Sequence, residues 1–528
     1  MLKQEVNLQG LSLPQSQFED AVLRMRRARS SYERKVVDFE LWDAIQDLLS
    51  TENYKPVLDD LRSSVKSPEV TKAFKNSDVT MEALSHYDGP EKRSFIWNEN
   101  FRLASNLLGE WIGKPSLTPI QYNTAEELLV HLPNKEASAG AIHSGSKADN
   151  VDLIFASYKE LVQKIEGGER PWVPALSFHR AQISGYMNDS GRFDPSGLKH
   201  KDRLVWGLSA DHVAVESQFA IPFVNHMSEN VGFYAGGKTP DQLRRRINVS
   251  AGRPRFWYSL DFSKFDQTVP SWLIRHAFSF VRMCYKHEHQ AQLQWIEDEF
   301  INTKIISYDG RVYSKDRGIP SGSNFTQAIG SICNALVIMT YLFSRMRGMS
   351  DRDRRRYVDG HMCTDRRNTD MLVMGDDNLF FWDVKLDLVD LSQYVSANFG
   401  MMIHPEKTDM GRNRIKFPVF LKREWRGVWE YRDLTELLIN VIHPERIRTY
   451  DGFTGYHLLY GLLRTYGAAF PIWSEGKLVH KMRENGGLSQ LRKLRGRNMP
   501  GVFRQFGDKA GELFYSQSKT FLSQEKLR

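Results

Sequence analysis

The sequence has 528 residues, a formal net charge of +8, a hydrophobic fraction of 41% and an aromatic fraction of 12%. These values exclude an intrinsically disordered chain, and the length allows several lobes with an ample core. The basic balance suits a polyanionic partner without identifying one.

Three cysteines are present, Cys284, Cys333 and Cys363, and no Cys-x-x-Cys occurs. This excludes a disulfide framework or a cysteine-rich zinc site and is typical of a reducing compartment. The longest apolar run, around residues 332–343, is too short to cross a bilayer, and no signal-peptide pattern opens the sequence. We therefore expect a soluble, intracellular protein without a membrane segment.

The first 80 residues are predicted to be helical. From Phe18 to Lys35, apolar residues at helical spacing alternate with arginines. This pattern fits a solvated basic face or an RNA-binding helix. More helices are predicted in 98–132 and 147–166. Between them, the small and polar residues after Pro133 predict a loop where another molecule can approach the backbone.

A strand is predicted over residues 199–207. Lys201 and Arg203 alternate along it, so both point to the same side. Two cations on one side can grip a polyphosphate. The alternative is an exposed sheet edge that its charges keep soluble.

A buried strand, residues 257–260, ends at Asp261, and Asp266 follows in a predicted turn before a helix that Pro270 opens. A hairpin is predicted in 303–317. It leads into a flexible glycine-containing loop, residues 318–325, which opens a long apolar helix. The basic stretch 345–356 is expected to be a solvent-exposed loop.

Residues 372–382 predict a β-hairpin whose turn is Gly375-Asp376-Asp377-Asn378. Adjacent carboxylates at the tip of a buried hairpin are costly unless a cation meets them, although such a pair taken alone is more often a solvated turn. After the hairpin we expect a helix to Phe399, a turn at Gly400, a strand pair near 419–425 and a helical last third with a basic tail.

Asp261 and the Asp376-Asp377 pair could meet on one sheet. Two magnesium ions roughly 3.5–4 Å apart, held by such carboxylates, are a standard device for in-line phosphoryl transfer. A glycine-containing loop before a helix allows a nucleotide to approach backbone N–H groups. These features together favour a nucleotidyl-transfer site.

Seven segments resemble, in order and rough spacing, motifs of viral RNA-dependent RNA polymerases, most closely those of picobirnaviruses and then partitiviruses. They are Ser138-Ala139-Gly140 (motif G), Lys201-x-Arg203 (F), Asp261-x4-Asp266 (A), Ser321-Gly322-x3-Thr326 (B), Gly375-Asp376-Asp377 (C), Lys407 (D) and Phe420-Leu421-Lys422-Arg423 (E). The resemblance covers about residues 134–425.

The resemblance implies roles for single residues. Asp261 and Asp376 would bind Mg²⁺ (Mn²⁺ as the alternative), Asp377 would assist them, and Lys407 would be the general acid. Nucleotides would meet Lys201, Arg203, Asp266, Ser321, Gly322, Thr326 and Asn334. RNA would meet Ser138, Gly140, Lys422 and Arg423.

One position departs from the pattern. Many relatives carry, four residues after the motif B threonine, an asparagine that helps to select ribose; here that position is Gly330 and the next asparagine is Asn334. Asp266 would contact the ribose 2′-hydroxyl, and Ser321, Asn324 or Thr326 would share the selection.

The implied fold is a helix-rich α+β right hand with an antiparallel palm sheet, closed into an encircled hand. We expect an N-terminal extension bridging fingers and thumb (1–80), fingers (81–250), a palm (251–425) with a fingers insertion near 275–320, and a thumb with a tail (426–528).

The implied function is viral RNA-directed RNA polymerase: genome replication and transcription of a double-stranded RNA virus, able to initiate without a primer. Template and product RNA, ribonucleoside triphosphates and capsid protein would be its partners. We expect a monomeric catalytic unit in the virion interior and host cytoplasm. Two alternatives are a reverse transcriptase-like polymerase and a non-enzymatic basic RNA-packaging protein. Gly375 and Asp266 argue against the first, because reverse transcriptases usually carry bulkier residues there.

Overall fold

The computed structural model of the chain describes residues 15–29, 34–35, 37–67, 71–72, 82–87, 94–187, 193–253, 255–307, 309–346, 348–365, 368–413, 415–427 and 429–444. Beyond residue 444 it describes only 454–456, 459, 477–478, 480–481 and 484. The basic tail predicted near the C-terminus lies outside these residues.

The chain divides into two compact units that do not follow its order. The first contains residues 1–30, 77–179 and 204–427, and the second contains 31–76, 180–203 and 428–528. The division falls within strands β3 (Ala175–Met187) and β4 (Phe193–Gly207), each of which belongs partly to both units. The expected fingers, palm and thumb boundaries stay a prediction.

The helices of the first unit are α1 (Gln15–Arg29), α5 (Glu99–Ile112), α6 (Ala125–His131), α7 (Val151–Glu166), α8 (Ala210–Asn230), α9 (Pro240–Ala251), α10 (Phe265–Thr268), α11 (Ser271–Arg282), η4 (His287–His289), α12 (Gln290–Ile301), α13 (Thr326–Ser344), α14 (Asp351–Met362) and α15 (Leu388–Phe399). Its strands are β5 (Phe256–Ser259), β6 (Phe262–Ser263), β7 (Lys304–Ile306), β8 (Val312–Ser314), β9 (Cys363–Asp365), β10 (Asn368–Thr369), β11 (Met371–Met374), β12 (Asp377–Trp382), β13 (Met402–Ile403), β14 (Asp409–Arg412), β15 (Val419–Phe420) and β16 (Arg423–Arg426).

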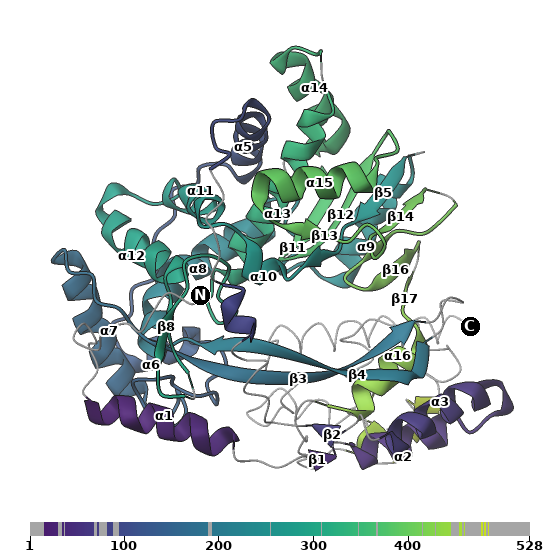
Figure 1. Cartoon of the computed structure of the whole chain (residues 1–528), viewed down its shortest axis with the longest axis horizontal. Coiled ribbons are helices and arrows are strands. Elements are labelled where there is room, and N and C mark those ends of the chain that lie inside the picture. The colour runs from purple at the N-terminus through teal and green to yellow at the C-terminus, as the bar shows by residue number, and fades with distance from the viewer. Residues whose placement is uncertain are drawn as a thin grey trace. The chain divides into compact units, whose positions relative to one another are not determined.

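The central element of the first unit is an antiparallel sheet with the strand order β11-β12-β5-β14 (Figure 1). Strands β5, β11 and β12 are mostly apolar because both of their faces are buried, whereas the edge strand β14 is partly exposed. Successive side chains point to opposite faces. Tyr258 and Phe380 therefore enter the large core that contains α13, while Trp257, Leu379 and Phe381 enter a second core with α9, β15 and β16.

Helix α13 is the core helix of this unit. By length and composition it could cross a membrane, but 89% of its most apolar window is buried inside the protein. It packs against α5, α11, α15 and β11. Its apolar character is therefore explained by burial in the middle of a large core.

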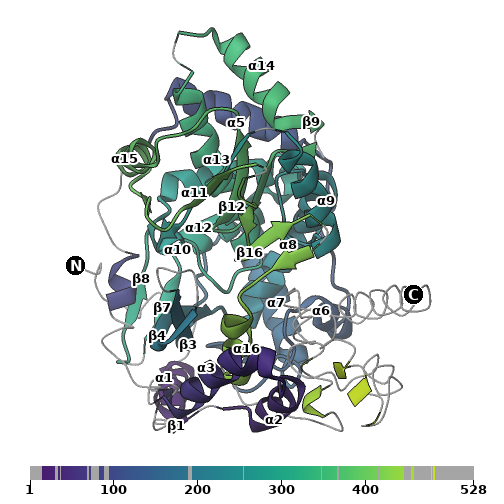
Figure 2. The ribbon, with the colours of Figure 1, turned by 90° about the vertical axis from the view of Figure 1, so that its right-hand side faces the viewer.

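Two segments near the sheet differ in how well the sequence predicted them. The predicted hairpin is formed by β7 and β8, and β7 pairs in parallel with the start of β3. The prediction that the basic stretch 345–356 is a loop is wrong for its second half, because helix α14 begins at residue 351. Both views show α14 beside α5 (Figures 1 and 2), and Arg354 donates a hydrogen bond to the Asn100 side chain (3.2 Å).

The second unit contains β1 (Arg34–Lys35), α2 (Phe39–Leu48), η2 (Glu52–Tyr54), α3 (Lys55–Lys66), β2 (Thr71–Lys72), β17 (Trp429–Tyr431) and α16 (Leu434–Ile442). Its core joins Leu41, Leu61 and Leu438 to Leu198 from β4. The first 80 residues are therefore divided between the units: α1 belongs to the first, and α2 and α3 to the second.

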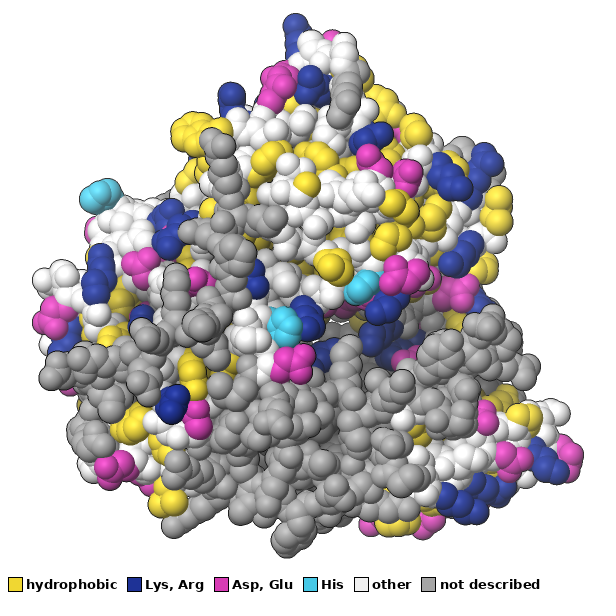
Figure 3. All heavy atoms as spheres, viewed as in Figure 1, with side chains coloured by type: hydrophobic (Ala, Val, Ile, Leu, Met, Phe, Trp, Pro, Cys, Tyr) yellow, Lys and Arg dark blue, Asp and Glu magenta, His cyan; other side chains and the backbone are white. Residues whose placement is uncertain are grey.

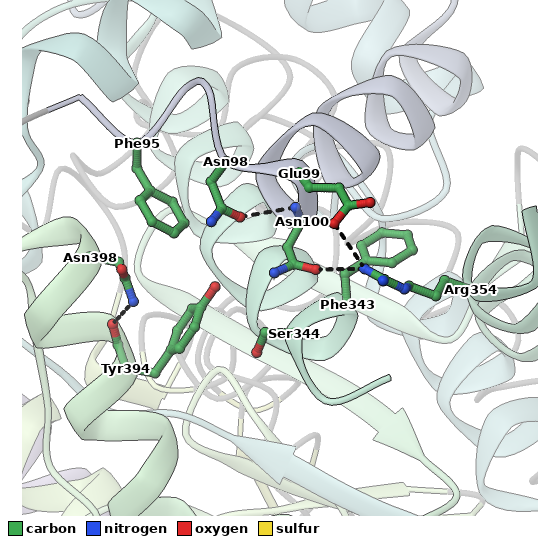
Figure 4. Close-up of a pocket in the computed structure, with 9 residues that line it drawn as sticks. All are labelled: Phe95, Asn98, Glu99, Asn100, Phe343, Ser344, Arg354, Tyr394 and Asn398. Atoms are coloured by element: carbon green, nitrogen blue, oxygen red, sulfur yellow. Dashed lines mark hydrogen bonds and ion pairs between the residues drawn. The ribbon is translucent and has the colours of Figure 1, made fainter. Parts of the chain in front are cut away.

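A polar pocket of about 360 Å³ lies between α5, α13, α14 and α15 (Figure 4). Its lining consists of Phe95, Asn98, Glu99, Asn100, Phe343, Ser344, Arg354, Tyr394 and Asn398. None of these is a residue that the sequence motifs point to. The candidate site must therefore be built from the motif residues themselves.

Candidate active site

The predicted carboxylate hairpin is confirmed. Met374 pairs with Asp377, so Gly375 and Asp376 form a two-residue turn between β11 and β12. Gly375 has φ +66°. A positive φ at the first turn position is typical of the tight turns whose twist matches an antiparallel pair, and glycine adopts it without strain. Asp376 is exposed at the tip, and Asp377 is half-buried beside it.

Asn378 joins this turn to the end of β5. Its buried side chain accepts a hydrogen bond from the Leu260 N–H (2.9 Å) and donates to the carbonyls of Leu260 (3.2 Å) and Asp376 (3.2 Å). A polar side chain inside a buried strand must be satisfied in this way. The residue directly before Asp261 is therefore fixed to the carboxylate turn.

Asp261 lies at the same end of the sheet as the turn. Phe380 pairs with Tyr258, and this register, continued toward the turn, leads Asp377 toward Asp261. Asp261 is exposed. Its backbone N–H donates to Thr408 Oγ1 (3.3 Å), and its carbonyl accepts from the His404 N–H (2.9 Å). Asp261 and the hairpin turn therefore lie at the same end of the sheet, and their joint binding of a metal ion stays a prediction.

Lys407 lies in the turn that makes these contacts with Asp261. Its backbone N–H donates to the carbonyl of His404 (3.2 Å), and its side chain is exposed. The expected general acid thus belongs to the segment that holds the end of the Asp261 strand.

Helix α13 supports the carboxylate turn from beneath. Ser331 Oγ accepts a hydrogen bond from the Gly375 N–H (2.9 Å). Asn334 Nδ2 donates to the carbonyls of Gly375 (3.0 Å) and Asp376 (2.9 Å). A Cβ at Gly330 would lie 3.5 Å from Gly375 Cα, an ordinary van der Waals distance, so this part of the helix lies directly against the turn.

The prediction that Asn334 contacts the nucleotide is wrong in this structure. Its side chain is fully buried and both hydrogen atoms of its amide face the turn carbonyls. Gly330 lies against the turn that Asn334 holds. Asn334 therefore supports the turn, and ribose selection by Asp266, Ser321, Asn324 or Thr326 stays a prediction.

Asp266 lies in the one-turn helix α10 rather than in the predicted turn. Its side chain is exposed, and its backbone carbonyl accepts a hydrogen bond from the Ile319 N–H (2.6 Å). Gly318 N–H donates to the carbonyl of Val269 (2.9 Å). The Asp266 segment and the 318–325 loop are therefore adjacent, as the predicted nucleotide site requires.

The 318–325 loop also contacts the end of β4. Ser321 Oγ accepts from the Trp206 N–H (3.1 Å), and a Cβ at Gly322 would lie 2.7 Å from the Trp206 carbonyl oxygen. Gly322 therefore permits a close backbone approach. Ser321 is exposed and keeps its hydroxyl proton for another acceptor, whereas the Thr326 hydroxyl donates to the Pro320 carbonyl and closes the loop.

A buried carboxylate on α8 holds the far end of this loop. Glu216 accepts from Ser323 Oγ (2.7 Å) and the Asn324 N–H (2.9 Å), and it lies 3.2 Å from His212 Nε2. Burial alone would lower the pKa of His212, but the Glu216 charge raises it overall. The loop is therefore held at this end by two hydrogen bonds, and its predicted flexibility stays a prediction.

Lys315 holds the near end. Its buried ammonium donates to the carbonyls of Ile301 (3.1 Å) and Gly318 (2.8 Å) and also to that of Phe300. Burial lowers the pKa of Lys315 well below its ordinary value. Two buried ionisable groups, Lys315 and Glu216, thus fix the loop at both ends.

The predicted loop after Pro133 closes on itself through a bridge between Ser138 and Ser146; we call residues 138–146 the 138–146 loop. Ser138 is exposed and remains a candidate RNA contact. Gly140 is buried, with φ +100°, and a Cβ there would lie 2.5 Å from Ser209 Cα. Its expected RNA contact is wrong: Gly140 packs the loop onto the start of α8.

The remaining basic candidates are placed only in part. The strand predicted for Lys201 and Arg203 is confirmed as β4, and Arg203 is exposed. The side chain of Lys201 lies outside the described residues. Lys422 is exposed in the turn between β15 and β16, where Leu421 and Lys422 have φ +54° and +56°. Arg423 begins β16 and is half-buried.

The carboxylates of Asp261, Asp376 and Asp377 are the kind of oxygen ligand that a hard divalent cation prefers. In the described part of the chain, no group of three or more His, Cys, Asp or Glu side chains could hold a metal ion. Mg²⁺ commonly takes one or two carboxylates together with water and substrate phosphates. The side chains of Asp261 and Asp376 are exposed, which fits that requirement. Their role as metal ligands stays a prediction.

Four supporting residues escaped prediction: Asn378, Ser331, Glu216 and Lys315. The role of Asn378 could have been inferred from the sequence, because a polar residue within an apolar strand must find a buried partner. Gly330, Ser331 and Asn334 share one side of α13, a spacing that permits close approach of another backbone. The burial of Glu216 could not be inferred from the sequence, since a glutamate in a helix is usually at the surface.

Comparison with known proteins agrees with the motif assignment. Residues 198–437 match the family model of viral RNA-dependent RNA polymerases. The chain is 34% identical over 148 residues to the RNA-directed RNA polymerase of Cryptosporidium parvum virus 1, covering 26% of this chain and 27% of that protein. It is 26% identical over 188 residues to the RNA-directed RNA polymerase of Nodamura virus, covering 35% and 16%. The chain thus spans little more than a quarter, at most, of these relatives.

Solved structures confirm the predicted fold class. The crystal structure of the RNA-dependent RNA polymerase of a human picobirnavirus has a TM-score of 0.62 at 15% identity, covering 92% of this chain and 90% of that one. Its insertion-loop deletion mutant has a TM-score of 0.59 at 14% identity, covering 92% and 93%. The helix-rich fold with antiparallel sheets is therefore that of picobirnavirus-like polymerases, whereas encirclement of a closed hand stays a prediction.

Proposed function

We propose that the chain is an RNA-directed RNA polymerase, because residues 198–437 match the family model of viral RNA-dependent RNA polymerases. It would join ribonucleotides to the 3′ end of a growing RNA on an RNA template. The observation that carries this proposal is the assembly of Asp261 and the Asp376-Asp377 turn at one end of the central sheet, with the 318–325 loop beside Asp266.

In the reaction, the 3′-oxygen of the growing strand bonds to the α-phosphorus of the incoming nucleotide as the bond to pyrophosphate breaks. Asp261 and Asp376 would hold two Mg²⁺ ions, with Asp377 assisting. Bound there, the metal ions would activate the 3′-hydroxyl and neutralise charge on the leaving pyrophosphate. Mn²⁺ is the alternative ion.

The chain's own groups would orient the substrate. Asp266 would accept a hydrogen bond from the ribose 2′-hydroxyl, and the exposed Ser321 hydroxyl is available at the same loop. Lys407 would give a proton to the departing pyrophosphate. The hydrogen bonds from α13 and Asn378 would keep Asp376 fixed, because misplacement by about 1 Å can cost about a hundredfold in rate.

The fingers, palm and thumb assignment, the use of this polymerase in genome replication and transcription, and initiation without a primer belong to the same proposal. So do a monomeric catalytic unit, a capsid protein partner, and action in the virion interior and host cytoplasm. Purified protein, a defined RNA template, the four ribonucleotides and Mg²⁺ or Mn²⁺ test the core claim. Labelled RNA product supports it, and product made only from deoxynucleotides supports the reverse transcriptase alternative.

The RNA-packaging alternative predicts tight RNA binding without any product. On the face seen in Figure 3, Lys and Arg side chains are interspersed with Asp and Glu among the described residues. A protein that packages RNA by charge alone would favour a contiguous basic patch.

Changing Asp266 to Ala should lower the discrimination between ribonucleotides and deoxynucleotides by about tenfold, because one hydrogen bond to the 2′-hydroxyl is lost. The backbone bond from Ile319 to residue 266 survives this change. The ratio of kcat/KM for a ribonucleotide and its deoxy analogue measures the effect. An unchanged ratio would move the role to Ser321 or Asn324.

Changing Arg203 to Ala should raise the apparent KM for nucleotides by up to about tenfold, because a charged phosphate contact is lost. Arg203→Lys keeps the charge without the bidentate geometry and should fall between the two. Steady-state kinetics at saturating template measure both. If only template affinity changes, the β4 strand lines the RNA path instead.

A further inference from the structure

Helix α1, predicted as a basic face, packs on the first unit and turns one arginine inward. Its apolar residues Phe18, Ala21 and Val22 are buried in a small core with Ala141, Leu176, Ile306 and Val312. One member of this core, Ala141, lies in the 138–146 loop. The helix is therefore attached to that loop by apolar contacts before any charge is considered.

Arg24 adds a second attachment to the same loop. Its Nη1 donates to the carbonyls of Gly140 (3.1 Å) and His143 (3.2 Å), and its Nη2 donates to the carbonyl of Ala141 (3.0 Å). Asp20, one turn earlier, lies 2.8 Å from Arg24 Nε and orients the guanidinium. Three carbonyls that converge on one planar group are a match for arginine in particular.

The N-terminus of α8 holds the other side of the loop. Ala210 N–H donates to the carbonyl of Ala139 (2.8 Å), and Ala141 N–H donates to Ser209 Oγ (3.1 Å). His143 Nε2 lies 3.0 Å from Asp211 Oδ1. The loop is therefore clamped between α1 and α8, while Ser138 and Ser144 remain exposed.

This arrangement has an electrostatic consequence. Backbone carbonyl oxygens carry partial negative charge, so carbonyls turned toward a nucleic acid would repel its phosphates. Arg24 binds three of them and so keeps them turned toward α1. The exposed hydroxyls of Ser138 and Ser144 are then left to meet a phosphate backbone.

We propose that Arg24 is a positioning residue for template RNA: it holds the 138–146 loop in the conformation that binds the template strand. The proposal rests on the proposed polymerase function. Arg24 itself would touch no RNA, since its guanidinium is occupied by the loop carbonyls and its side chain is only 22% exposed. The N-terminal helix thereby acts on the RNA path through this loop.

The test compares Arg24→Ala, Arg24→Lys and wild type in the full chain. Fluorescence polarisation with labelled single-stranded RNA gives the template Kd, and elongation at saturating template gives the nucleotide KM. Both variants should raise the template Kd by about tenfold or more, because a lysine keeps the charge but reaches only part of the carbonyl set. The nucleotide KM should stay unchanged.

Arg62→Ala is the matched control. Arg62 also lies in the N-terminal region, but it is half-exposed and pairs only locally with Asp59 (2.9 Å). Its removal takes away the same charge and should leave the template Kd at the wild-type value. An equal loss in this control would assign the effect to net charge and overturn the proposal.

Loop order gives a second readout that does not depend on RNA. Lys135, exposed beside the loop, is a trypsin site, and its cleavage should be faster in both Arg24 variants while the melting temperature stays close to wild type.

A wild-type template Kd in Arg24→Ala, or full recovery in Arg24→Lys, would overturn the proposal. Absence of RNA synthesis by the wild type would instead refute the polymerase function.

Discussion

Changing Asp376 to Asn should abolish RNA synthesis, with a fall in rate of at least about a thousandfold, while RNA binding stays near wild type. The amide removes a charged metal ligand at the tip of the hairpin and with it several kcal/mol of transition-state stabilisation. RNA affinity depends mainly on contacts with phosphates, which Asp376 does not make. Primer-extension rates and a template Kd measured on the same preparation test this.

Asp359→Asn is the matched control for Asp376→Asn. It is the same isosteric loss of charge, at an exposed position on α14, and synthesis should continue at the wild-type rate. Wild-type synthesis by Asp376→Asn would refute the assignment of the whole site, because the hairpin carboxylate would then have no chemical role.

Changing Asn334 to Ala should lower kcat by about a hundredfold with little change in the nucleotide KM. The change removes the donor to two turn carbonyls, at 3.0 and 2.9 Å, and leaves the Asp376 carbonyl only the longer hydrogen bond from Asn378 (3.2 Å). The turn must then relax, and Asp376 moves from its working position. Single-turnover rates and nucleotide titrations separate this loss from weaker nucleotide binding.

Two further variants sharpen the Asn334 experiment. Ser331→Ala removes the acceptor for the Gly375 N–H and should act in the same direction with a smaller effect. Asn398→Ala removes an asparagine whose amide donates only to the carbonyl of Tyr394 (2.8 Å) within its own helix, and it should leave kcat unchanged. If Asn334→Ala instead changes the preference for ribose without lowering kcat, Asn334 contacts the sugar, as the sequence alone suggested.

Several structural features were accessible from local sequence because their causes are local. The Gly375-Asp376 turn follows from glycine's tolerance of positive φ between two apolar runs. The end of α15 at Gly400, with φ +70°, has the same cause. Apolar strands with a single aspartate at one end likewise indicated where the sheet would present carboxylates.

The errors share one cause: whether a polar group faces substrate or protein depends on its partners. Asn334 and Gly140 stand at positions that suggest ligand contact, yet both are buried against another backbone. The 318–325 loop has a flexible composition but is held by Glu216 and Lys315, two charges whose burial no local pattern reveals. Arg24 is a further example: the sequence of its helix suggests a solvent-exposed basic face, but its guanidinium binds loop carbonyls.

The sequence by itself thus determined the chemical groups of this protein and their order along the chain, including the carboxylate hairpin and the strand that ends at Asp261. Only the tertiary structure decided which polar groups are free to meet RNA and nucleotides and which are used to hold the site together. The reason is physical: burying a polar group without a partner is costly, so distant segments such as α13, α8 and α1 supply those partners. That pairing is set by packing between segments far apart in the chain.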